Sequence, residues 1–249
     1  MQNVLNTLRV LEEVATRQPV GVGELARVLG MPKSSTQRAL HTLNTAGWIR
    51  QARGEVTRWV LTTRALDVGR HATEELSLRD AGMPVLEELR ARTEETIHLM
   101  VPEGDKVVLI ERLQTPKAVR IVLPLGINLP LHASANGKAV LAHMQPAYID
   151  RLMRTPLPGY THTTITSNER LQGELAAIRR RGYATNSGEW RSDVAAVAAA
   201  VLDSDGVPVA SLSISTPRTR MPEELVPTYG RHVKAAALAL AARLGYARE

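Results

Sequence analysis

Apolar residues recur at helical spacing in the first part of the chain and predict three helices. The first, over residues 3–16, carries one apolar stripe formed by Val4, Leu5, Leu8, Leu11, Val14 and Ala15. A shorter helix over 24–29 ends at Gly30, and a third begins with Pro32 in its first turn and ends at Gly47. Proline suits the first turn of a helix, because the amide hydrogen that it lacks would have no partner there.

The third predicted helix has two faces of different character. One face is apolar and consists of Thr36, Ala39, Leu40 and Leu43. The other face carries hydroxyl, amide and basic groups and no carboxylate: Ser34, Gln37, Arg38, His41 and Thr45. Two short strands, over 48–51 and 55–61, follow around the basic tip "ARGE". Three helices and a hairpin in this order predict a winged helix-turn-helix over residues 1–62, whose third helix would enter a DNA major groove.

A long helical stretch follows from Thr63 to about Thr93. Leu66, Gly69, Ala72 or Thr73, and Leu76 keep a three-four spacing that predicts a narrow apolar seam. An ordinary amphipathic helix that packs on its own domain would show the same spacing. We expect Pro84 to divide the stretch into two helices and assign residues 63–78 to a linker helix.

Residues 79–249 alternate between strand and helix patterns. The segments "TIHLMVPEGDKVVLIERL" and "VAAVAAAVLDSDGVPVASLSIS" each predict two strands joined by a tight turn. "SANGKAVLAHM" predicts a helix capped by Ser134, residues 167–181 predict another, and the closing helix is expected to bend at Pro227. The predicted fold class is therefore α+β: an antiparallel sheet flanked by helices, behind the N-terminal domain.

Composition narrows the classes of function. The 249 residues include no cysteine, which excludes disulfides, zinc–thiolate sites and cysteine nucleophiles. We find no apolar run long enough to span a membrane and no signal peptide, and we therefore expect a soluble, cytoplasmic protein without a membrane partner. The formal net charge is +6, and residues 1–62 supply eight basic against four acidic side chains. This positive excess favours encounter with a polyanion, although a merely soluble surface could carry it too.

The chemistry of the third helix matches DNA recognition. Free amides at a helix start favour phosphate, arginine can pair with guanine through two hydrogen bonds, and glutamine can pair with adenine in the same way. The candidate DNA-binding residues are Lys33, Ser34, Ser35, Thr36, Gln37, Arg38 and His41 on this helix, with Arg53 and Arg58 beside the wing tip. Because one such module buries little surface, we expect a dimer on a roughly palindromic double-stranded operator.

Several longer motifs resemble the IclR family of bacterial transcription regulators. They are "PVGVGELARVLGMPKSSTQRALHTLNTAGWI", "LPLHASANGKAVLA", "RGYATNSGEWRSDVAAVAAAVLDSDGVPVASLSIS" and the final "ALAARLGY", and they cover nearly the whole chain in order. The resemblance implies a winged helix, a linker helix that dimerises, and a GAF-like effector-binding domain over residues 79–249. It also implies a homodimer or a dimer of dimers. The chain departs from the family at Ala196, Ala195 and Asn186, where Cys, Arg, and Asp or Ser are usual. These losses favour a weakly polar or aromatic effector, or none.

The effector-binding residues follow from the resemblance together with the strand and helix patterns. The helix start offers Ser134, Ala135, Asn136 and Gly137, and glycine there would let a ligand approach the backbone closely. Ser213 and Ser215 alternate on one strand and share a face with Ala196 by resemblance. Glu189 could add a charge or simply lie on the surface. The predicted apolar wall consists of Met100, Leu123, Leu125 and Ile127, each of which could equally be ordinary core.

Two other classes of protein fit less well. A GAF-like enzyme would need a nucleophile or a metal site, yet the seven histidines lack zinc-site spacing and no third residue orients the His132–Ser134 pair. We therefore expect no metal, no cofactor and no catalytic residue, and place His98 and His132 near the pocket as packed or hydrogen-bonded histidines. An RNA-binding module would need stacking platforms, but the chain has three tryptophans, five tyrosines and no phenylalanine.

Overall fold

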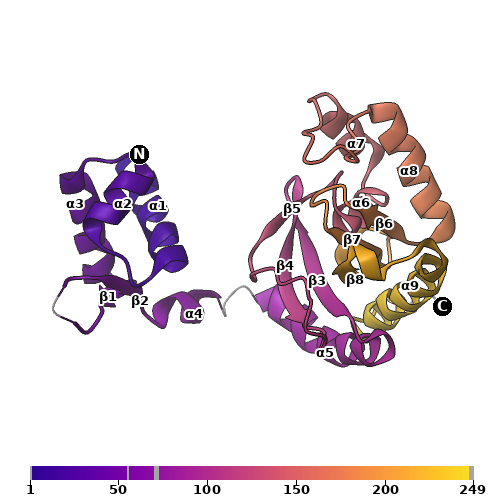
Figure 1. Ribbon diagram of the computed structural model, residues 1–249, viewed down its shortest axis with the longest axis horizontal. Helices are drawn as coiled ribbons and strands as arrows, with labels where there is room; N and C mark the ends of the chain where they lie inside the picture. The colour runs from indigo at the N-terminus through magenta and orange to yellow at the C-terminus, as the bar shows by residue number, and fades with distance from the viewer. Residues whose placement is uncertain (1, 55, 70–72, 247–249) are drawn as a thin grey trace. The chain divides into compact units, whose positions relative to one another are not determined.

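The structure is a computed structural model that describes residues 2–54, 56–69 and 73–246. The chain divides into two compact units, residues 1–73 and 74–249. Each unit has its own hydrophobic core, and Figure 1 labels their helices and strands. None of the described helices is long and apolar enough to cross a membrane.

The first unit is a winged helix-turn-helix, as predicted. Helices α1 (Gln2–Arg17), α2 (Val22–Leu29) and α3 (Lys33–Thr45) precede strands β1 (Ile49–Gln51) and β2 (Trp59–Leu61) and the short helix α4 (Arg64–Gly69). The core contains Val10, Val14, Leu25, Leu40 and Trp59. The predicted apolar stripe of α1 faces inward only in part: Val14 is buried and Leu11 half-buried, whereas Val4, Leu5, Leu8 and Ala15 are exposed. Gly30 ends α2 with a φ of 61°, a left-handed conformation that glycine adopts without strain and that turns the chain into α3.

Two further details of this unit differ from the prediction. Pro32 is the residue before α3 rather than its first helical residue, and its carbonyl accepts from the amides of Ser35 and Thr36. The second strand begins at Trp59 rather than residue 55, because the ladder pairs only Ile49–Gln51 with Trp59–Leu61. The wing tip is therefore longer than the pattern indicated.

The predicted linker at 63–78 corresponds to α4 and the first residues of α5 (Thr73–Thr93). Ala72 lies outside the described residues, as do the side chains of Thr73 and Leu76. Gly69 is the last residue of α4, and Leu66 is exposed. The expectation that Pro84 divides this stretch is wrong: Pro84 lies within α5, which continues to Thr93. Leu86 and Leu89 beyond the proline are buried against the sheet, and this packing stabilises the helix despite the missing hydrogen bond.

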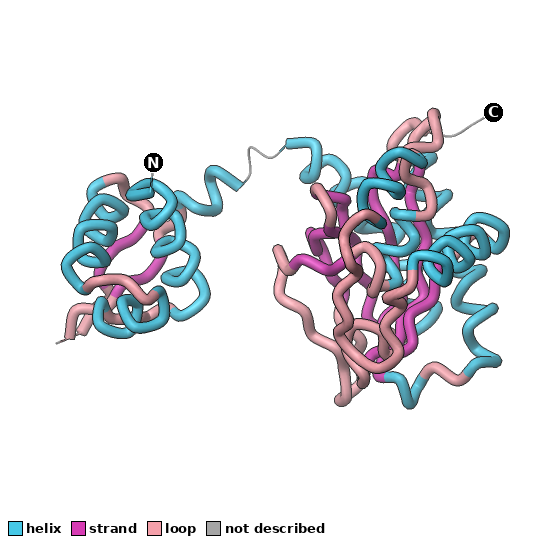
Figure 2. Tube along the Cα trace, turned by 90° about the horizontal axis from the view of Figure 1, so that it is seen from above, coloured by secondary structure: helices cyan, strands magenta, loops and turns pink. Residues whose placement is uncertain are grey.

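The second unit is a six-stranded antiparallel sheet covered by helices on both faces (Figures 1 and 2). The strand order is β5-β4-β3-β8-β7-β6. The strands are β3 (Thr96–Glu103), β4 (Lys106–Leu113), β5 (Asn128–Pro130), β6 (Ala184–Ser187), β7 (Val194–Leu202) and β8 (Pro208–Pro217). The helices after α5 are α6 (Ala135–Leu141), α7 (Pro146–Met153), α8 (Asn168–Arg181) and α9 (Val226–Arg243), with single 3₁₀ turns at Arg218–Arg220 and Glu223–Leu225. Pro227 lies in the first turn of α9 and does not bend it.

The two faces of the sheet pack against different helices. α6 and α8 cover one face through a core that includes Leu141, Leu171 and Leu175, whereas α5 and α9 cover the other through Leu86 and Leu240. Strand β8 is buried on both sides and alternates accordingly. Leu212 and Ile214 belong to the core on the α5–α9 face, whereas Ser211, Ser213 and Ser215 point to the α6 face.

Candidate nucleic-acid interface and small-molecule pocket

The polar face of α3 is open to solvent. The side chains of Lys33, Ser34, Gln37, Arg38 and His41 are all exposed, and the first turn of the helix holds no acidic residue. On the opposite side, Ala39, Leu40 and Leu43 are buried in the core of the unit. This arrangement leaves a donor-rich surface at the start of a helix, where the backbone dipole also favours negative charge.

Two of the predicted α3 residues have other surroundings. Thr36 is fully buried and its hydroxyl donates to the carbonyl of Pro32, so its assignment to the DNA-binding surface is wrong. Thr36 belongs to the apolar phase of the helix, and a hydroxyl there bonds to the preceding turn. Ser35 is half-buried, and its Oγ accepts from Arg38 Nη2 at 3.3 Å, which orients the arginine along the exposed face.

The two predicted wing arginines differ in freedom. Arg53 is exposed in the tip. Arg58 Nη1 donates to the carbonyl of Pro19 at 3.0 Å and lies 3.9 Å from Glu24, so this arginine ties the wing to the segment before α2. Arg50 was not among the predicted residues, yet it is an exposed residue of β1 that lines the same shallow hollow on the wing as Arg53. Its place in the strand next to the basic tip is the signal that could have identified it.

A small pocket with little free volume, which we call the closed pocket, lies in the second unit between the sheet, the start of α6 and the loop before β7. Its volume is about 30 Å³. Seven of the predicted effector residues line it: Leu123, Ser134, Ala135, Asn136, Ala196, Ser213 and Ser215. The strand register explains the grouping, because Ala196 on β7 is paired with Ser215 on β8, and His98 on β3 is paired with Ser213.

Three buried side-chain atoms on this face of the sheet have no hydrogen-bond partner among the described residues: His98 Nε2, Ser213 Oγ and Arg112 Nη1. They lie in one cross-strand row, since His98 is paired with Arg112 on β4 and with Ser213 on β8. Burial, and to a smaller extent the charge of Arg112, lowers the pKa of His98 to about 4, so this ring is neutral at pH 7. Buried polar atoms are usually paired, and this row therefore marks a place where a ligand could supply partners.

Five predicted effector residues do not line the pocket. Met100 is core beneath α6, two residues beyond His98, and Ile127 is packed against the same core. Leu125 is exposed, because the chain turns between Pro124 and Ile127 and interrupts the alternation of Ile121 and Leu123.

Gly137 has a packing role instead of a ligand-binding one. A side chain there would meet the carbonyl oxygen of Pro130 at 2.4 Å and Cα of Leu131 at 2.6 Å. Its amide donates to Ser134 Oγ, as expected for the predicted cap. The glycine thus lets α6 approach the backbone after β5, and no ligand is needed to explain it.

Glu189 is buried and its charge is already compensated. Lys138 Nζ donates to both carboxylate oxygens, and the Lys138 side chain is among the most buried in the described chain. Asn186 continues the network, because its Oδ1 accepts from the Glu189 amide and its Nδ2 donates to the carbonyl of Ala133. Together these contacts hold the loop before β7 against α6.

The pocket also includes side chains that the sequence analysis did not assign to it: Ile121, Leu129, Asn186, Trp190, Arg191 and Val194, together with His98, which it placed only nearby. Asn186 and Val194 flank the loop, on β6 and β7. The alternation of side chains along these paired strands could have indicated that both residues face the pocket. Trp190 and Arg191 lie within the loop, where no periodicity applies. Among the described residues, no group of three His, Asp or Glu side chains could hold a metal ion.

Comparison with known proteins decides the family. Residues 4–53 match the family model described as the IclR helix-turn-helix domain, and residues 70–242 match the bacterial transcriptional regulator IclR C-terminal model. The chain belongs to the IclR family of bacterial transcriptional regulators. It is similar to the transcriptional repressor IclR of Escherichia coli, at 32% identity over 95% of this chain and 88% of that protein. The regulator KdgR of the same organism is 30% identical over 99% of this chain and 94% of its own length.

Solved structures agree with this assignment over the full chain. The IclR protein of Thermotoga maritima is 27% identical with a TM-score of 0.82, covering 99% of this chain and 100% of that one. An IclR homologue from Microbacterium hydrocarbonoxydans, crystallised with 4-hydroxybenzoate, is 26% identical with a TM-score of 0.83, covering 98% and 100%. The IclR-family protein is thus a DNA-binding transcriptional regulator with a C-terminal effector-binding domain, and it is not an enzyme.

Proposed function

We propose that this IclR-family regulator recognises its operator through the exposed face of α3 and the tip of the wing. The observation that carries the proposal is the set of exposed donors on α3, with no acidic residue in its first turn. Arg38, held by Ser35, and the adjacent Gln37 suit base edges in the major groove. Lys33, Ser34 and His41 suit phosphates beside them, and Arg53 suits the DNA backbone.

We propose further that the protein binds DNA as a dimer, or as a pair of dimers. A single winged helix buries too little surface for tight specific binding, and two copies one helical turn apart, about 34 Å, would double the contacts. The stretch 63–78, with α4 and the start of α5, is the candidate linker that joins the subunits. The operator would then be roughly palindromic. Sedimentation of the full chain with and without operator DNA tests this assembly, and operator binding by a monomer would overturn it.

The effector of this proposal is a small, weakly polar organic molecule in the closed pocket. Ala196 and Leu123 supply apolar surface, and Ser213 and His98 supply polar atoms without partners. The related Microbacterium regulator crystallised with 4-hydroxybenzoate supports an effector of this size. Since an engineered cavity that binds benzene has a volume of about 150 Å³, binding would require the 30 Å³ pocket to widen. A ligand that binds the widened form more tightly would shift the equilibrium of the regulator toward that conformation.

The DNA-binding surface is tested with two matched variants. Fragments of a genomic pool that bind the full chain supply the operator, and its affinity is then measured by a gel shift. Arg38→Ala should weaken binding by roughly tenfold or more and relax discrimination at one base pair. Arg9→Ala is the control, since Arg9 is an equally exposed arginine on α1 outside the proposed surface. Equal affinities for the parent and both variants would show that α3 is not the reading helix.

A further inference from the structure

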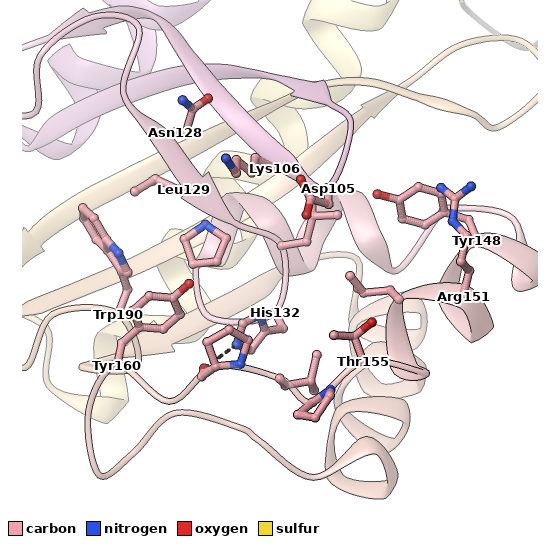
Figure 3. Close-up of a pocket in the computed structure, with 16 residues that line it drawn as sticks. Asp105, Lys106, Asn128, Leu129, His132, Tyr148, Arg151, Thr155, Tyr160 and Trp190 are labelled. Carbon is pink, nitrogen blue, oxygen red and sulfur yellow. Dashed lines mark hydrogen bonds between the residues drawn. The ribbon is translucent and has the colours of Figure 1, made fainter. Parts of the chain in front are cut away.

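A larger, open pocket lies beside the closed pocket in the second unit, and two residues line both of them. The open pocket has a volume of about 520 Å³, within the range of small-molecule sites. The shared residues are Leu129 and Trp190. Leu129 is buried on β5, whereas Trp190 is half-buried in the loop before β7. These two side chains therefore form the wall between the pockets, and Figure 3 shows both of them among the residues that line the open pocket.

Most of the closed pocket consists of parts that cannot move aside. Ala196 and Ser213 lie on β7 and β8, which are paired with each other and have a further strand on either side. Ser134 caps α6, and Gly137 in the first turn of that helix lies against the backbone of Leu131. Widening the pocket at these walls would break strand pairing or the close packing of α6.

The backbone next to Trp190 is also held in place. Thr161 Oγ1 donates to the carbonyl of Gly188 at 2.6 Å. Thr164 Oγ1 donates to the carbonyl of Glu189 at 2.5 Å. The carboxylate of Glu189 is held as well by its buried ion pair with α6. The loop therefore cannot swing outward as a whole while these contacts persist.

The indole of Trp190 has no comparable restraint. Among the described residues it makes no hydrogen bond, ring contact or cation–π contact. Apolar packing against the core on the α6 face holds it in place. The open pocket beside it has room for an indole, and a side chain can change rotamer while its backbone stays fixed. Trp190 is thus the part of the wall that can move at the smallest cost.

We propose that Trp190 is the gate of the effector site, and that its indole turns into the open pocket and joins the two pockets. This inference rests on the proposed effector function. The joined cavity admits a ring-sized effector, which the closed pocket of about 30 Å³ excludes. Without a ligand the indole returns, because it then buries apolar surface. An effector that fills the space left by the indole binds only the joined form and therefore favours it.

A different wall of the closed pocket offers the alternative route. Ile121 and Arg191 line both the closed pocket and a separate hollow on the surface. Ile121 is buried, and the segment that carries it accepts a hydrogen bond from Arg220 at 2.7 Å. Arg191 is paired with Asp193 at 3.0 Å. These contacts hold that wall closed and favour Trp190 as the side chain that moves.

The experiment uses the full chain, which contains no cysteine. Ser213→Cys places a single thiol in the closed pocket, at a fully buried position. The rate at which methyl methanethiosulfonate modifies this thiol reports how often the pocket is open, because a buried thiol reacts only when the reagent reaches it. Adding Trp190→Ala should raise the rate by roughly tenfold or more, since minor conformations are typically populated to about 10% or less.

Two controls identify the wall that opens. Ser211→Cys is the matched thiol, because Ser211 is equally buried on the same strand and face but does not line the closed pocket. Its rate should not respond to Trp190→Ala. Ile121→Ala, at the other wall, should raise the rate of the Ser213→Cys variant much less than Trp190→Ala does.

Three results would overturn the proposal. The first is a rate for Ser213→Cys that Trp190→Ala leaves unchanged. The second is an equal or larger increase in the Ile121→Ala variant, which would place the opening at the other wall and leave the effector function intact. The third is an equal increase for Ser211→Cys, which would show unfolding of the unit in place of a gate. Operator binding by α3 is measured separately, by the gel shift.

Discussion

Lys138 Nζ lies 2.6 Å and 2.7 Å from the two carboxylate oxygens of Glu189, and the lysine side chain is 1% exposed. The pair joins α6 to the loop that carries Trp190. Glu174 is a more distant partner of the same lysine, at 3.8 Å, and is itself paired with Arg181. A buried charge of this kind is stable only while its partner remains in place.

Glu189→Leu should therefore lower the free energy of unfolding of the second unit by about 3 kcal/mol, because it leaves the Lys138 ammonium buried with Glu174, at 3.8 Å, as its remaining carboxylate among the described residues. Urea denaturation followed by circular dichroism measures the change. Replacing both residues, Lys138→Met with Glu189→Leu, should recover much of the loss. The exposed pair Arg92–Glu88 is the control, and Arg92→Ala should cost less than about 1 kcal/mol. A loss of similar size at both pairs would contradict this account.

His98 should make the protein less stable in mild acid. Its pKa in the folded protein is about 4 and its ordinary value is 6.5, so the unfolded chain binds the proton more tightly. The contribution of the neutral ring is fully present above pH 6.5 and is lost as the pH falls toward 4, to a total of about 3 kcal/mol. Denaturation of His98→Asn at a series of pH values should show a free energy of unfolding that varies less with pH than that of the parent, by this same amount. His41→Asn, at an exposed position, should behave as the parent does.

Gly137→Ala should be strongly destabilising, by about 2 kcal/mol or more, since the added carbon meets backbone atoms that cannot move aside. Gly173 offers the matched control within α8, because a side chain there meets nothing within 4 Å. Gly173→Ala should stabilise the protein by about 0.5–1 kcal/mol through helix propensity. Thermal unfolding of the two variants should thus shift in opposite directions, and a shared direction would contradict the assigned packing role.

Two of the serines at the closed pocket should respond differently to truncation. Ser134 caps α6 and donates to the carbonyl of Pro130, so Ser134→Ala should cost about 1–2 kcal/mol. Ser213 Oγ has no partner, so Ser213→Ala should leave the free energy of unfolding within about 0.5 kcal/mol of the parent. Urea denaturation of both variants gives the comparison. A cost at Ser213 as large as that at Ser134 would show that its hydroxyl is bound within the protein.

Arg53→Ala should weaken binding to all duplexes about equally, because the wing tip is proposed to contact the DNA backbone. The slope of log affinity against log salt concentration should fall by about one. Fluorescence anisotropy on the operator and on an unrelated duplex, over a salt series, measures both effects. A change confined to the operator would mean that Arg53 reads bases.

The N-terminal unit could be predicted closely from the sequence, because helical periodicity and the glycines after α2 and α3 are local signals. The same periodicity places Thr36 in the core, yet its hydroxyl suggested a DNA contact. The prediction followed the chemistry of the hydroxyl rather than the place of Thr36 on the apolar face of the helix. Because Thr36 is buried, its place on the helix was the better guide. At Pro84 the local signal failed instead. Proline predicts a break in the helix, but the packing of Leu86 and Leu89 against the sheet keeps α5 continuous.

About half of the closed pocket could be predicted, and the division follows strand geometry. Ser213, Ser215 and Ala196 lie on paired strands, where alternation and register determine which side chains meet. Trp190 and Arg191 lie in a loop that long-range contacts hold in place. Lys138, a charged residue with no predicted partner, is paired with a carboxylate 51 positions later in the chain. Such pairings form only in the completed fold and produce no periodic pattern in the sequence.

The alternation of side chains along β8 connects the closed pocket directly to the helices on the opposite face of the sheet. Ser213 and Ser215 face the closed pocket, while Leu212 and Ile214 on the same strand pack with α5 and α9. A shift of one backbone segment by a fraction of an ångström would reach both layers at once. A signal could then cross this sheet without a chain of intermediate side chains. The strand β8 alone would carry it, because one of its sides lines the closed pocket and the other packs with α5 and α9.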